Sequence, residues 1–310
     1  MAERTVLSEK AIIELSSICG KQVLVGEPMS SYTTFRIGGP ADYMCSPSDP
    51  EALSRVLAWT ASEGIGRLVM GAGSNMLVSD KGVRGIVIRT DRMRAWMVEG
   101  GNLVAEAGAL MPRLANDLAE MGLSGFTEAC GIPGSVGGGL CMNAGAYGWN
   151  ISDVTELVEA VDGSGRPMEL TGQEMAFGTK TSALMRDGLI ATRLHAKLIS
   201  IDKDKIKKRI SELLEDRARK QPLDLPSAGC AFKNPSGNGA GRLIDQCGLK
   251  GRSIGGAAVS DKHANFIVNA KAATAQDVRE LLELVRRVVY ETTGEKLVPV
   301  YVVTDKIAAG

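Results

Sequence analysis

The chain lacks a charge excess, a long apolar run and more than two histidines. Its 310 residues contain 36 Lys and Arg against 36 Asp and Glu, so the formal net charge is zero. A neutral balance excludes the broad electrostatic attraction that nucleic acid or an anionic membrane requires, although local basic segments can still bind anionic small molecules. A membrane span needs about 20 apolar residues, and no run approaches that length. His195 and His263 are too few and too far apart in sequence to predict a metal site.

Paired cysteines are also missing. The six cysteines are scattered, and their spacing matches neither a CxxC pair nor a zinc motif. The start of the chain shows no charged segment followed by an apolar one, which is the pattern of a secretory signal. We therefore expect a cytoplasmic protein with reduced thiols, at Cys19, Cys45, Cys130, Cys141, Cys230 and Cys247. A length of 310 residues and 44% hydrophobic content suffice for about two domains with real cores.

The usual phosphate-binding motifs are absent, but two glycine-rich loops are present. There is no GxxxxGK[ST], and Gly71–Met76 lacks the third glycine of a Rossmann fingerprint. The segment Cys130–Gly148 holds seven glycines in nineteen residues. Glycine at this density is costly in a regular element, but it lets backbone N–H groups approach a ligand closely. Two such loops favour one elongated ligand, a dinucleotide, over the alternative that both are merely tight turns.

Local patterns in the first two thirds of the chain predict an α+β domain whose shorter glycine-rich loop follows a strand. Capping residues, glycine stops and apolar periodicity set the bounds of these elements. The expected elements are a helix from Ser48 to Gly64, strands Arg67–Met70 and Gly85–Ile88, a helix Met111–Met121, and strands Val154–Val161 and Leu189–Leu198.

The last third predicts a second domain with two long helices. The charged segment 201–220 carries an apolar stripe, so we expect an amphipathic helix that opens this domain with its charges solvated. A capping pattern at Thr274 begins the last helix, which Gly294 ends before a strand at Leu297–Val303. Between them lie two polar segments, Ser227–Pro235 and Ser260–Asn269, which taken alone are typical of loop edges.

Seven segments, in this order, resemble one protein family. They include SYTTFRIGGPAD, GAGSN, GIPGSVGG, MNAGAY, SAGCAFKNP, AGRLID and VSDKHANFIVN, spread from Ser31 to Asn269. Together they resemble the UDP-N-acetylenolpyruvoylglucosamine reductases, the MurB family of flavoproteins, and the likeness runs from about residue 25 to 303. The resemblance implies an FAD-binding fold of the vanillyl-alcohol-oxidase type in two subdomains, residues 1–90 and 91–200, followed by a smaller α+β substrate domain, residues 201–310. The chain resembles the shorter branch, which lacks an extra substrate-capping segment.

The resemblance also implies a reaction and a set of site residues. In this family NADPH reduces FAD, the flavin reduces the enolpyruvyl group of a UDP-sugar, and an acid protonates the product, UDP-N-acetylmuramate, a peptidoglycan precursor. Lys180 and Cys230 take the catalytic positions. The implied flavin-binding residues are Arg36, Gly71, Ala72, Gly73, Ser74, Asn75, Met76, Gly131, Pro133, Gly134, Ser135, Gly138, Asn143, Ala144 and Gly145. The implied substrate-binding residues are Lys233, Asn234, Lys262, His263 and Asn265.

Three positions depart from the family's pattern. Cys230 stands where the family usually has a serine proton donor, and a thiol with a pKa of about 8.5 is the better acid. Lys180 replaces an arginine, which keeps the charge for the substrate carboxylate and enolate but loses the bidentate fork. Val300 replaces a glutamate and can do no acid–base work, while Glu295 is too distant in sequence to substitute without rearrangement.

Two functions remain open from the sequence. The retained polar groups of the substrate segments favour a working reductase, since a relic has no physical reason to keep them together. The loss of the glutamate favours a flavin-binding homologue without this activity, such as a sensor or a regulatory partner. The sequence leaves the oligomeric state undetermined.

Overall fold

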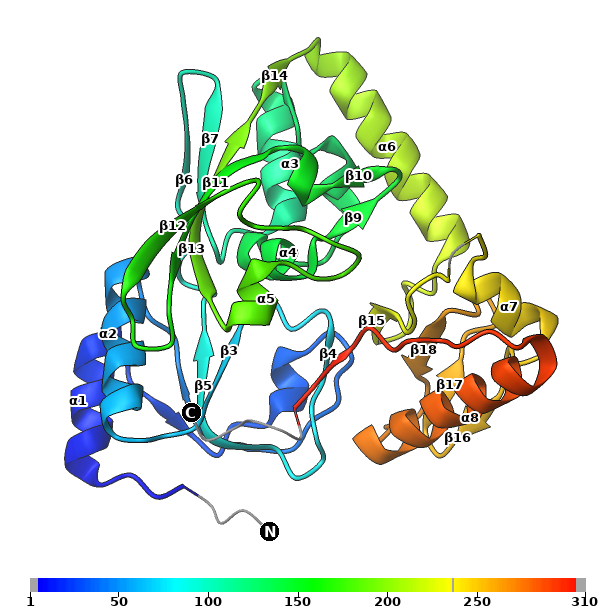
Figure 1. Ribbon diagram of the computed structural model, residues 1–310, viewed down its shortest axis with the longest axis horizontal. Coiled ribbons are helices and arrows are strands. Elements are labelled where there is room, and N and C mark those ends of the chain that lie inside the picture. Colours follow the sequence, from blue (N-terminus) through cyan, green and yellow to red (C-terminus); the bar gives the residue numbers. More distant parts are fainter. Residues whose placement is uncertain (1–4, 236, 305–310) are drawn as a thin grey trace.

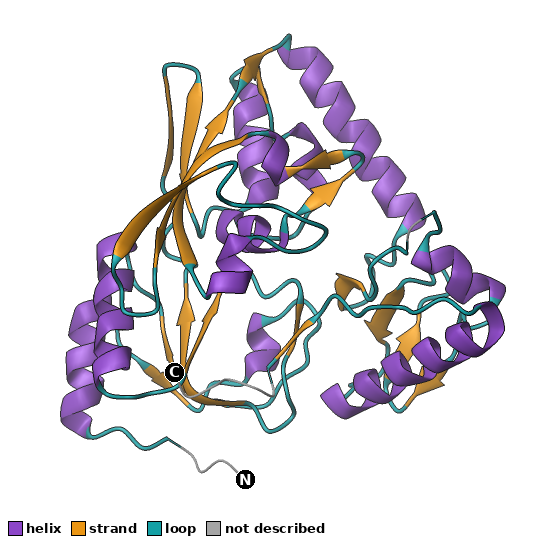
Figure 2. Cartoon of the chain, in the orientation of Figure 1, coloured by secondary structure: helices purple, strands orange, loops and turns teal. Residues whose placement is uncertain are grey.

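The computed structural model describes residues 5–235 and 237–304. In this part of the chain the helices pack against three sheets of four or five strands, with smaller two-stranded pairs beside them (Figure 1, Figure 2). None of the described helices is long and apolar enough to cross a membrane.

The first sheet contains the parallel strands that carry the shorter glycine-rich loop. Its order is β1 (Leu24–Val25), β2 (Ala41–Cys45), β5 (Val83–Arg89) and β3 (Arg67–Met70), with β2 and β3 parallel to β5. Helices α1 (Glu9–Cys19) and α2 (Pro50–Ser62) pack their apolar faces onto it. Because β3 and β5 run in one direction, their carboxyl ends lie together at the edge where Gly71 begins.

Helix α2 begins and ends where local signals predict. Asp49 is the N-cap, and its side chain accepts a hydrogen bond of 2.7 Å from Ala52 N. Ser48, where the helix was expected to begin, donates its hydroxyl to Asp49 at 2.5 Å, and the cap lies one residue later. Pro50 occupies the first turn, where its missing N–H costs nothing, and Gly64 follows the helix with a φ of 62°.

The second sheet is antiparallel and contains strands that the sequence analysis missed. Its order is β12 (Pro167–Thr171), β11 (Thr155–Val161), β13 (Ile190–Lys197), β7 (Asn102–Glu106) and β6 (Trp96–Glu99). The predicted strands correspond to β11 and β13. Strand β12, at the edge of the sheet, was missed although Met168 and Leu170 alternate with polar residues, and four of its five residues are exposed. Helices α3 (Met111–Glu120) and α4 (Val136–Met142) cover one face and share a core with β11 and β13.

Helix α6 (Lys203–Lys220) forms as predicted, but its apolar stripe packs elsewhere than expected. Ile206, Ile210 and Leu213 join the core of the second sheet. The helix therefore extends the middle part of the chain, as Figure 1 shows, and reaches the C-terminal domain only with its last turn. The boundaries at residues 90 and 200 stay a prediction.

The C-terminal domain is a four-stranded antiparallel sheet with two helices. Its strand order is β15 (Ser227–Cys230), β18 (Phe266–Asn269), β17 (Ala257–Val259) and β16 (Ser253–Ile254). Helices α7 (Ala240–Gln246) and α8 (Ala275–Thr293) pack against it. The predicted capping box of α8 is present, with Thr274 and Asp277 bonding each other's backbone N–H, and Gly294 ends the helix with a φ of 75°.

After α8 the chain returns to the first part of the molecule. Only β19 (Val302–Val303) of the predicted strand at Leu297–Val303 is regular, and it pairs in parallel with β4 (Met76–Leu77). Asp80 also accepts hydrogen bonds from Ala275 N and Gln276 N, at 2.7 and 3.1 Å, at the start of α8. These contacts attach the C-terminal domain to the glycine-rich loop region. The short elements between the sheets are η1 (Met29–Tyr32), β8 (Leu123–Ser124), η2 (Thr127–Gly131), β9 (Gly145–Ala146), β10 (Trp149–Asn150), η3 (Ile151–Asp153), α5 (Ala183–Asp187) and β14 (Ile199–Ser200).

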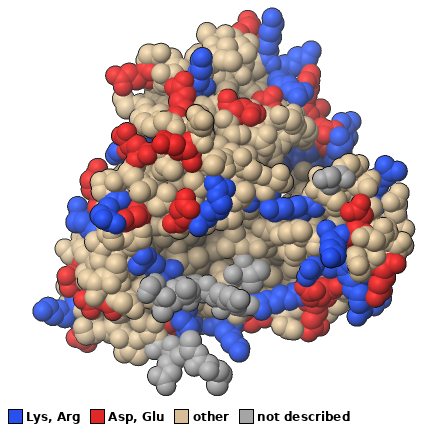
Figure 3. All heavy atoms as spheres, viewed as in Figure 1, with Lys and Arg blue, Asp and Glu red and all other residues tan. Residues whose placement is uncertain are grey.

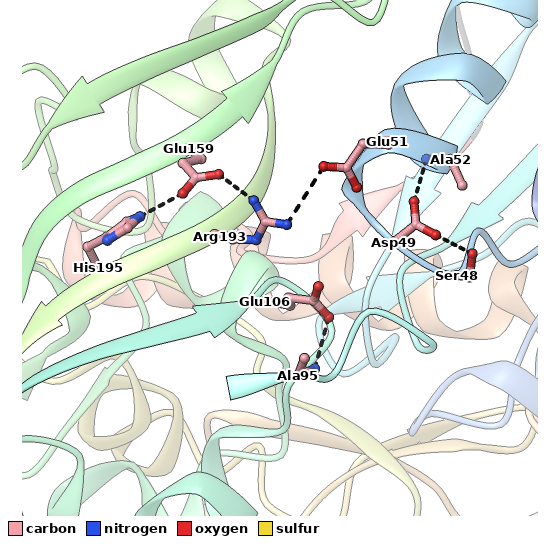
Figure 4. Close-up of polar contacts among 9 residues, drawn as sticks. All are labelled: Ser48, Asp49, Glu51, Ala52, Ala95, Glu106, Glu159, Arg193 and His195. Atoms are coloured by element: carbon pink, nitrogen blue, oxygen red, sulfur yellow. Dashed lines mark hydrogen bonds and ion pairs between the residues drawn. The ribbon is translucent and has the colours of Figure 1, made fainter. Parts of the chain in front are cut away.

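A chain of ion pairs joins the second sheet to α2. Glu159 lies between His195 Nε2, at 2.7 Å, and Arg193, at 2.9 Å, and Arg193 reaches Glu51 at 3.9 Å (Figure 4). Burial alone would raise the pKa of Glu159, but the hydrogen bonds from His195 and Arg193 outweigh it, so the pKa lies below its ordinary value. The contact of Arg193 with Glu51 is the link of this network to α2.

Candidate active site

A cavity of about 1030 Å³ lies where the three parts of the chain meet. Its walls come from the carboxyl ends of β3 and β5, the start of α4, the last turn of α6 and the end of β15. On the face drawn in Figure 3 the middle of the molecule is hollowed, and Lys and Arg atoms lie along its edges. The cavity is large enough for a dinucleotide.

The two glycine-rich loops touch each other at this cavity. A methyl group on Gly71 would overlap the hydroxyl of Ser135, and one on Gly73 would overlap the carbonyl of Tyr32. Gly73 also has a φ of 66°, a conformation that L side chains rarely adopt. Glycine is required at both positions because the Cβ of any other residue would overlap these neighbours.

The longer loop leads into α4. Ser135 is its N-cap and accepts a hydrogen bond of 3.4 Å from Gly138 N. A Cβ on Gly137 would lie 2.9 Å from Cβ of Ala107, so glycine lets the helix approach this segment closely. The loop consequently lines the cavity, while most of its backbone N–H groups bond to main-chain carbonyls or to Ser135 Oγ.

Thirteen of the fifteen implied flavin-binding residues line this cavity, and two do not. Gly131 packs against the side chain of Arg217, whose Cδ would lie 2.8 Å from an added Cβ. Asn143 adopts a φ of 43° at the end of α4, and its side chain donates to the carbonyl of Gly178 at 3.2 Å. Both support the walls instead of facing the cavity. The thirteen are Arg36, Gly71, Ala72, Gly73, Ser74, Asn75, Met76, Pro133, Gly134, Ser135, Gly138, Ala144 and Gly145.

Cys230 ends β15 with its thiol toward the cavity. The pairing of β15 with β18 shifts register between Ser227 and Cys230, and Gly229, with a φ of 77°, lies in that irregularity. The side chain is exposed to the cavity, yet protein surrounds it. Burial therefore raises the pKa of the thiol, while the cations of Lys180 and Arg217 partly oppose that rise. The thiol is protonated at neutral pH and can act as an acid.

Lys180 lies on a tight turn opposite Cys230. Its φ is 56°, and Gly178 and Thr181 bond each other's backbone on either side of it. Lys233, three residues after Cys230, donates from Nζ to the carbonyl of Thr179 at 2.9 Å. Burial lowers the pKa of Lys180 against the opposing effect of Cys230, and the nearby Lys233 lowers it further. The turn is thus held against the strand that carries the thiol.

Val300 also faces the cavity. Its N–H donates to Ala231 O at 2.9 Å, and its carbonyl accepts from Asn75 Nδ2 at 3.2 Å. The residue therefore sits between the shorter glycine-rich loop and the strand of Cys230. The carboxylates among the lining residues are Asp216, which is ion-paired with Arg219 and Lys220, and Asp224.

Of the five implied substrate-binding residues, His263 lines the cavity. Burial lowers the pKa of this histidine, and its ring packs edge-on against Phe266 at 4.9 Å, so it is neutral at pH 7. The buried side chain of Asn265 accepts a hydrogen bond from the N–H of Phe232 and donates one to its carbonyl, both at 2.9 Å. It supports the strand next to Cys230.

The other three implied substrate residues make contacts outside the cavity wall. Lys233 holds the Lys180 turn, as described above. Asn234 accepts a hydrogen bond of 3.0 Å from Ala240 N at the start of α7. Lys262 donates to the carbonyl of Ala218 at 2.5 Å, in the last turn of α6.

The contribution of α6 to the site was not expected from the sequence. Arg217 and Lys220 line the cavity, although their segment was interpreted as a solvated charged face. Burial lowers the pKa of Arg217, which lies near Cys230 and Tyr147. The sequence feature that could have indicated this role is the group of cations in the last turn of the helix, directly before Gln221-Pro222 ends it.

Comparison with known proteins agrees with this architecture. A model of FAD-binding domains matches residues 41–171. A structure of a berberine bridge enzyme variant in complex with (S)-reticuline covers 63% of this chain and 44% of its own, with a TM-score of 0.50 at 15% identity, which shows the fold alone. The fold and the paired glycine-rich loops define an FAD-binding protein of the vanillyl-alcohol-oxidase type, as predicted.

The relatives define the family more narrowly. A model of the C-terminal domain of UDP-N-acetylenolpyruvoylglucosamine reductase matches residues 221–303. The reductase of that name from Caldanaerobacter subterraneus is 44% identical over 278 residues, 90% of this chain and 92% of the relative. The crystal structure of the reductase from Thermus caldophilus has a TM-score of 0.77 at 38% identity, covering 91% of this chain and 98% of its own. The chain belongs to the UDP-N-acetylenolpyruvoylglucosamine reductase (MurB) family.

Proposed function

We propose that the protein is a UDP-N-acetylmuramate dehydrogenase of the cytoplasm. It uses NADPH, through FAD, to reduce the enolpyruvyl group of UDP-N-acetylglucosamine enolpyruvate in peptidoglycan precursor synthesis. The observation that carries this proposal is the 44% identity over 90% of the chain to a reductase of that name. The cavity supports it, because a thiol and a lysine meet there beside the glycine-rich loops.

The residues present fit FAD. Both glycine-rich loops line the cavity and let a pyrophosphate approach their backbone closely, and Arg36 adds a positive charge. Ile132, Leu189 and Ile190 supply apolar wall for a ring system. When bound, FAD supplies the hydride transfer that amino acid side chains cannot perform.

The chain's own residues bind the substrate, stabilise the negative charge that develops on it and protonate its carbon. Lys180 places an ammonium group toward the substrate carboxylate, where it stabilises negative charge that develops as the double bond is reduced. Arg217, from the last turn of α6, adds a second cation. The S–H bond of Cys230 breaks as its proton forms a C–H bond with the substrate carbon, and a thiolate remains.

Anaerobic stopped-flow spectroscopy of the purified flavoprotein tests this function. We expect NADPH to bleach the flavin and the enolpyruvyl UDP-sugar to restore its absorbance. Reduction by NADPH without reoxidation by the sugar nucleotide would overturn the proposal. That result would favour the second candidate, a flavin-binding homologue that acts as a sensor or regulatory partner, which the valine at position 300 supports.

A further inference from the structure

Two groups that can exchange a proton face one cavity from different parts of the fold. Lys180 comes from the turn between β12 and β13, and Cys230 from the end of β15. The hydrogen bond of 2.9 Å from Lys233 Nζ to Thr179 O ties these segments together one residue before Lys180 and three after Cys230. This side-chain bond holds the turn of Lys180 beside the segment that follows Cys230.

The protein surroundings bring the pKa values of Lys180 and Cys230 closer together. Free lysine and cysteine differ by about 2 units, near 10.4 and 8.5. Burial lowers the pKa of Lys180 and raises the pKa of Cys230. The other charged groups near the pair are Lys233, on the loop after β15, and Arg217, on α6. An arginine remains protonated in proteins, so Arg217 can attract a thiolate but cannot supply it with a proton.

We propose that Lys180 is the proton source that restores the Cys230 thiol after each turnover, an inference that rests on the proposed function. Protonation of the substrate carbon leaves a thiolate at Cys230. An N–H bond of the Lys180 ammonium then breaks and an S–H bond forms, which leaves a neutral amine. The amine takes a proton from water at the open side of the cavity. Each cycle consumes one solvent proton, and no oxidant or reductant beyond NADPH is needed.

Three features of this chain support the relay. Val300 places an apolar side chain between the shorter glycine-rich loop and the strand of Cys230, so no carboxylate can return the proton from that position. Lysine can release a proton where arginine cannot. The neutral state of Lys180 is made accessible by its burial beside another lysine.

The variant Lys180→Arg separates charge from proton release. The arginine keeps a cation beside the substrate and the thiol, so we expect the first turnover to slow far less than the later ones. Later turnovers should slow by roughly 10²-fold, the lower range for loss of a general acid. Rapid-quench measurement with NADPH and substrate in excess should therefore show a burst of one product per site, which the wild type lacks. The control is Lys207→Arg, the same change on α6 at a lysine that is ion-paired with Glu120 of α3. This variant should show no burst.

The pH dependence of Cys230 alkylation by iodoacetamide provides a readout that does not depend on turnover. Lys180→Arg should leave the apparent pKa of the thiol as in the wild type, while Lys180→Ala should raise it because a cation is lost. Steady-state turnover of Lys180→Arg at the wild-type rate would overturn the relay. An equally slow first turnover would also overturn it, because the lysine would then only position substrate. If wild-type flavin is not reoxidised by the sugar nucleotide, the proposed function itself fails.

Discussion

Asn75 donates a hydrogen bond from Nδ2 to the main-chain carbonyl of Val300 at 3.2 Å. The two residues are 225 positions apart, and the bond joins the shorter glycine-rich loop to the segment that follows α8. Together with the parallel pairing of β19 and β4, it places an apolar side chain at the cavity. The departure from the family that the sequence predicts at this position would therefore bear on the chemistry and not on a remote surface.

A glutamate at position 300 should restore an acid–base group. We expect Val300→Glu to accelerate flavin reoxidation by substrate, because a positioned general acid or base contributes up to roughly 10²–10⁴ in rate. The rate of flavin reduction by NADPH is the internal control and should change little. A variant that binds FAD normally but reoxidises no faster than the wild type would show that the chain has adapted to the valine.

The flavin should be bound without a covalent link. Cys141 lines the cavity, but burial raises the pKa of its thiol, which keeps it protonated and a poor nucleophile. Purified protein should be yellow, and acid precipitation should release the flavin into the supernatant. Flavin that remains in the pellet would contradict this, and a Cys141→Ala control would then locate the bond.

Cys230 should serve only the second half-reaction. Cys230→Ala should leave NADPH reduction nearly intact and slow reoxidation by substrate at least roughly 10²-fold, while Cys230→Ser should keep appreciable activity. Because the thiol must be protonated, the wild-type rate should fall as pH rises through its pKa, which burial raises above the ordinary value. The serine variant should lack this limb. Equal losses in both half-reactions would instead indicate a structural cysteine.

The contact between the glycine-rich loops should not tolerate a side chain at Gly71. Gly71→Ala would drive a methyl group into the hydroxyl of Ser135, which we expect to destabilise the protein by about 1–3 kcal/mol and to weaken FAD binding. Gly239→Ala is the matched control, because a Cβ there has no atom within 4 Å. Urea unfolding and flavin titration measure both effects. Equal behaviour of the two variants would mean that the loops separate easily.

The ion-pair network of Figure 4 should stabilise the protein near neutral pH. Arg193→Ala should cost roughly 0.5–1 kcal/mol at pH 7, since the groups are only partly buried. The pKa of Glu159 is lowered in the folded state, so its contribution is present above the unfolded pKa of about 4.3 and is lost as pH falls through the lower folded value. Unfolding free energies at pH 7 and pH 3 should therefore differ less in the variant. A pH-independent difference would assign the effect to packing.

The sequence by itself determined those parts of the protein that depend on neighbouring residues. Caps and apolar periodicity near Asp49 and Thr274 set the starts of α2 and α8, because a helix terminus is satisfied by side chains only a few positions away. The glycine-rich loops and the order of the motifs likewise predicted the family and the cofactor class. Close approach of the backbone to a pyrophosphate requires glycine, and a cluster of glycines is visible in the sequence.

Only the tertiary structure decided which distant groups meet. The stripe of α6 is equally apolar whichever core it joins, so the pattern alone could not assign the helix to the second sheet. The same limit applies to Lys233, which reaches Thr179 across 54 residues, and to Val300, which reaches Asn75 across 225. Such contacts form because burial of several apolar faces brings whole domains together, and that free energy is a property of the packed chain and not of any local segment.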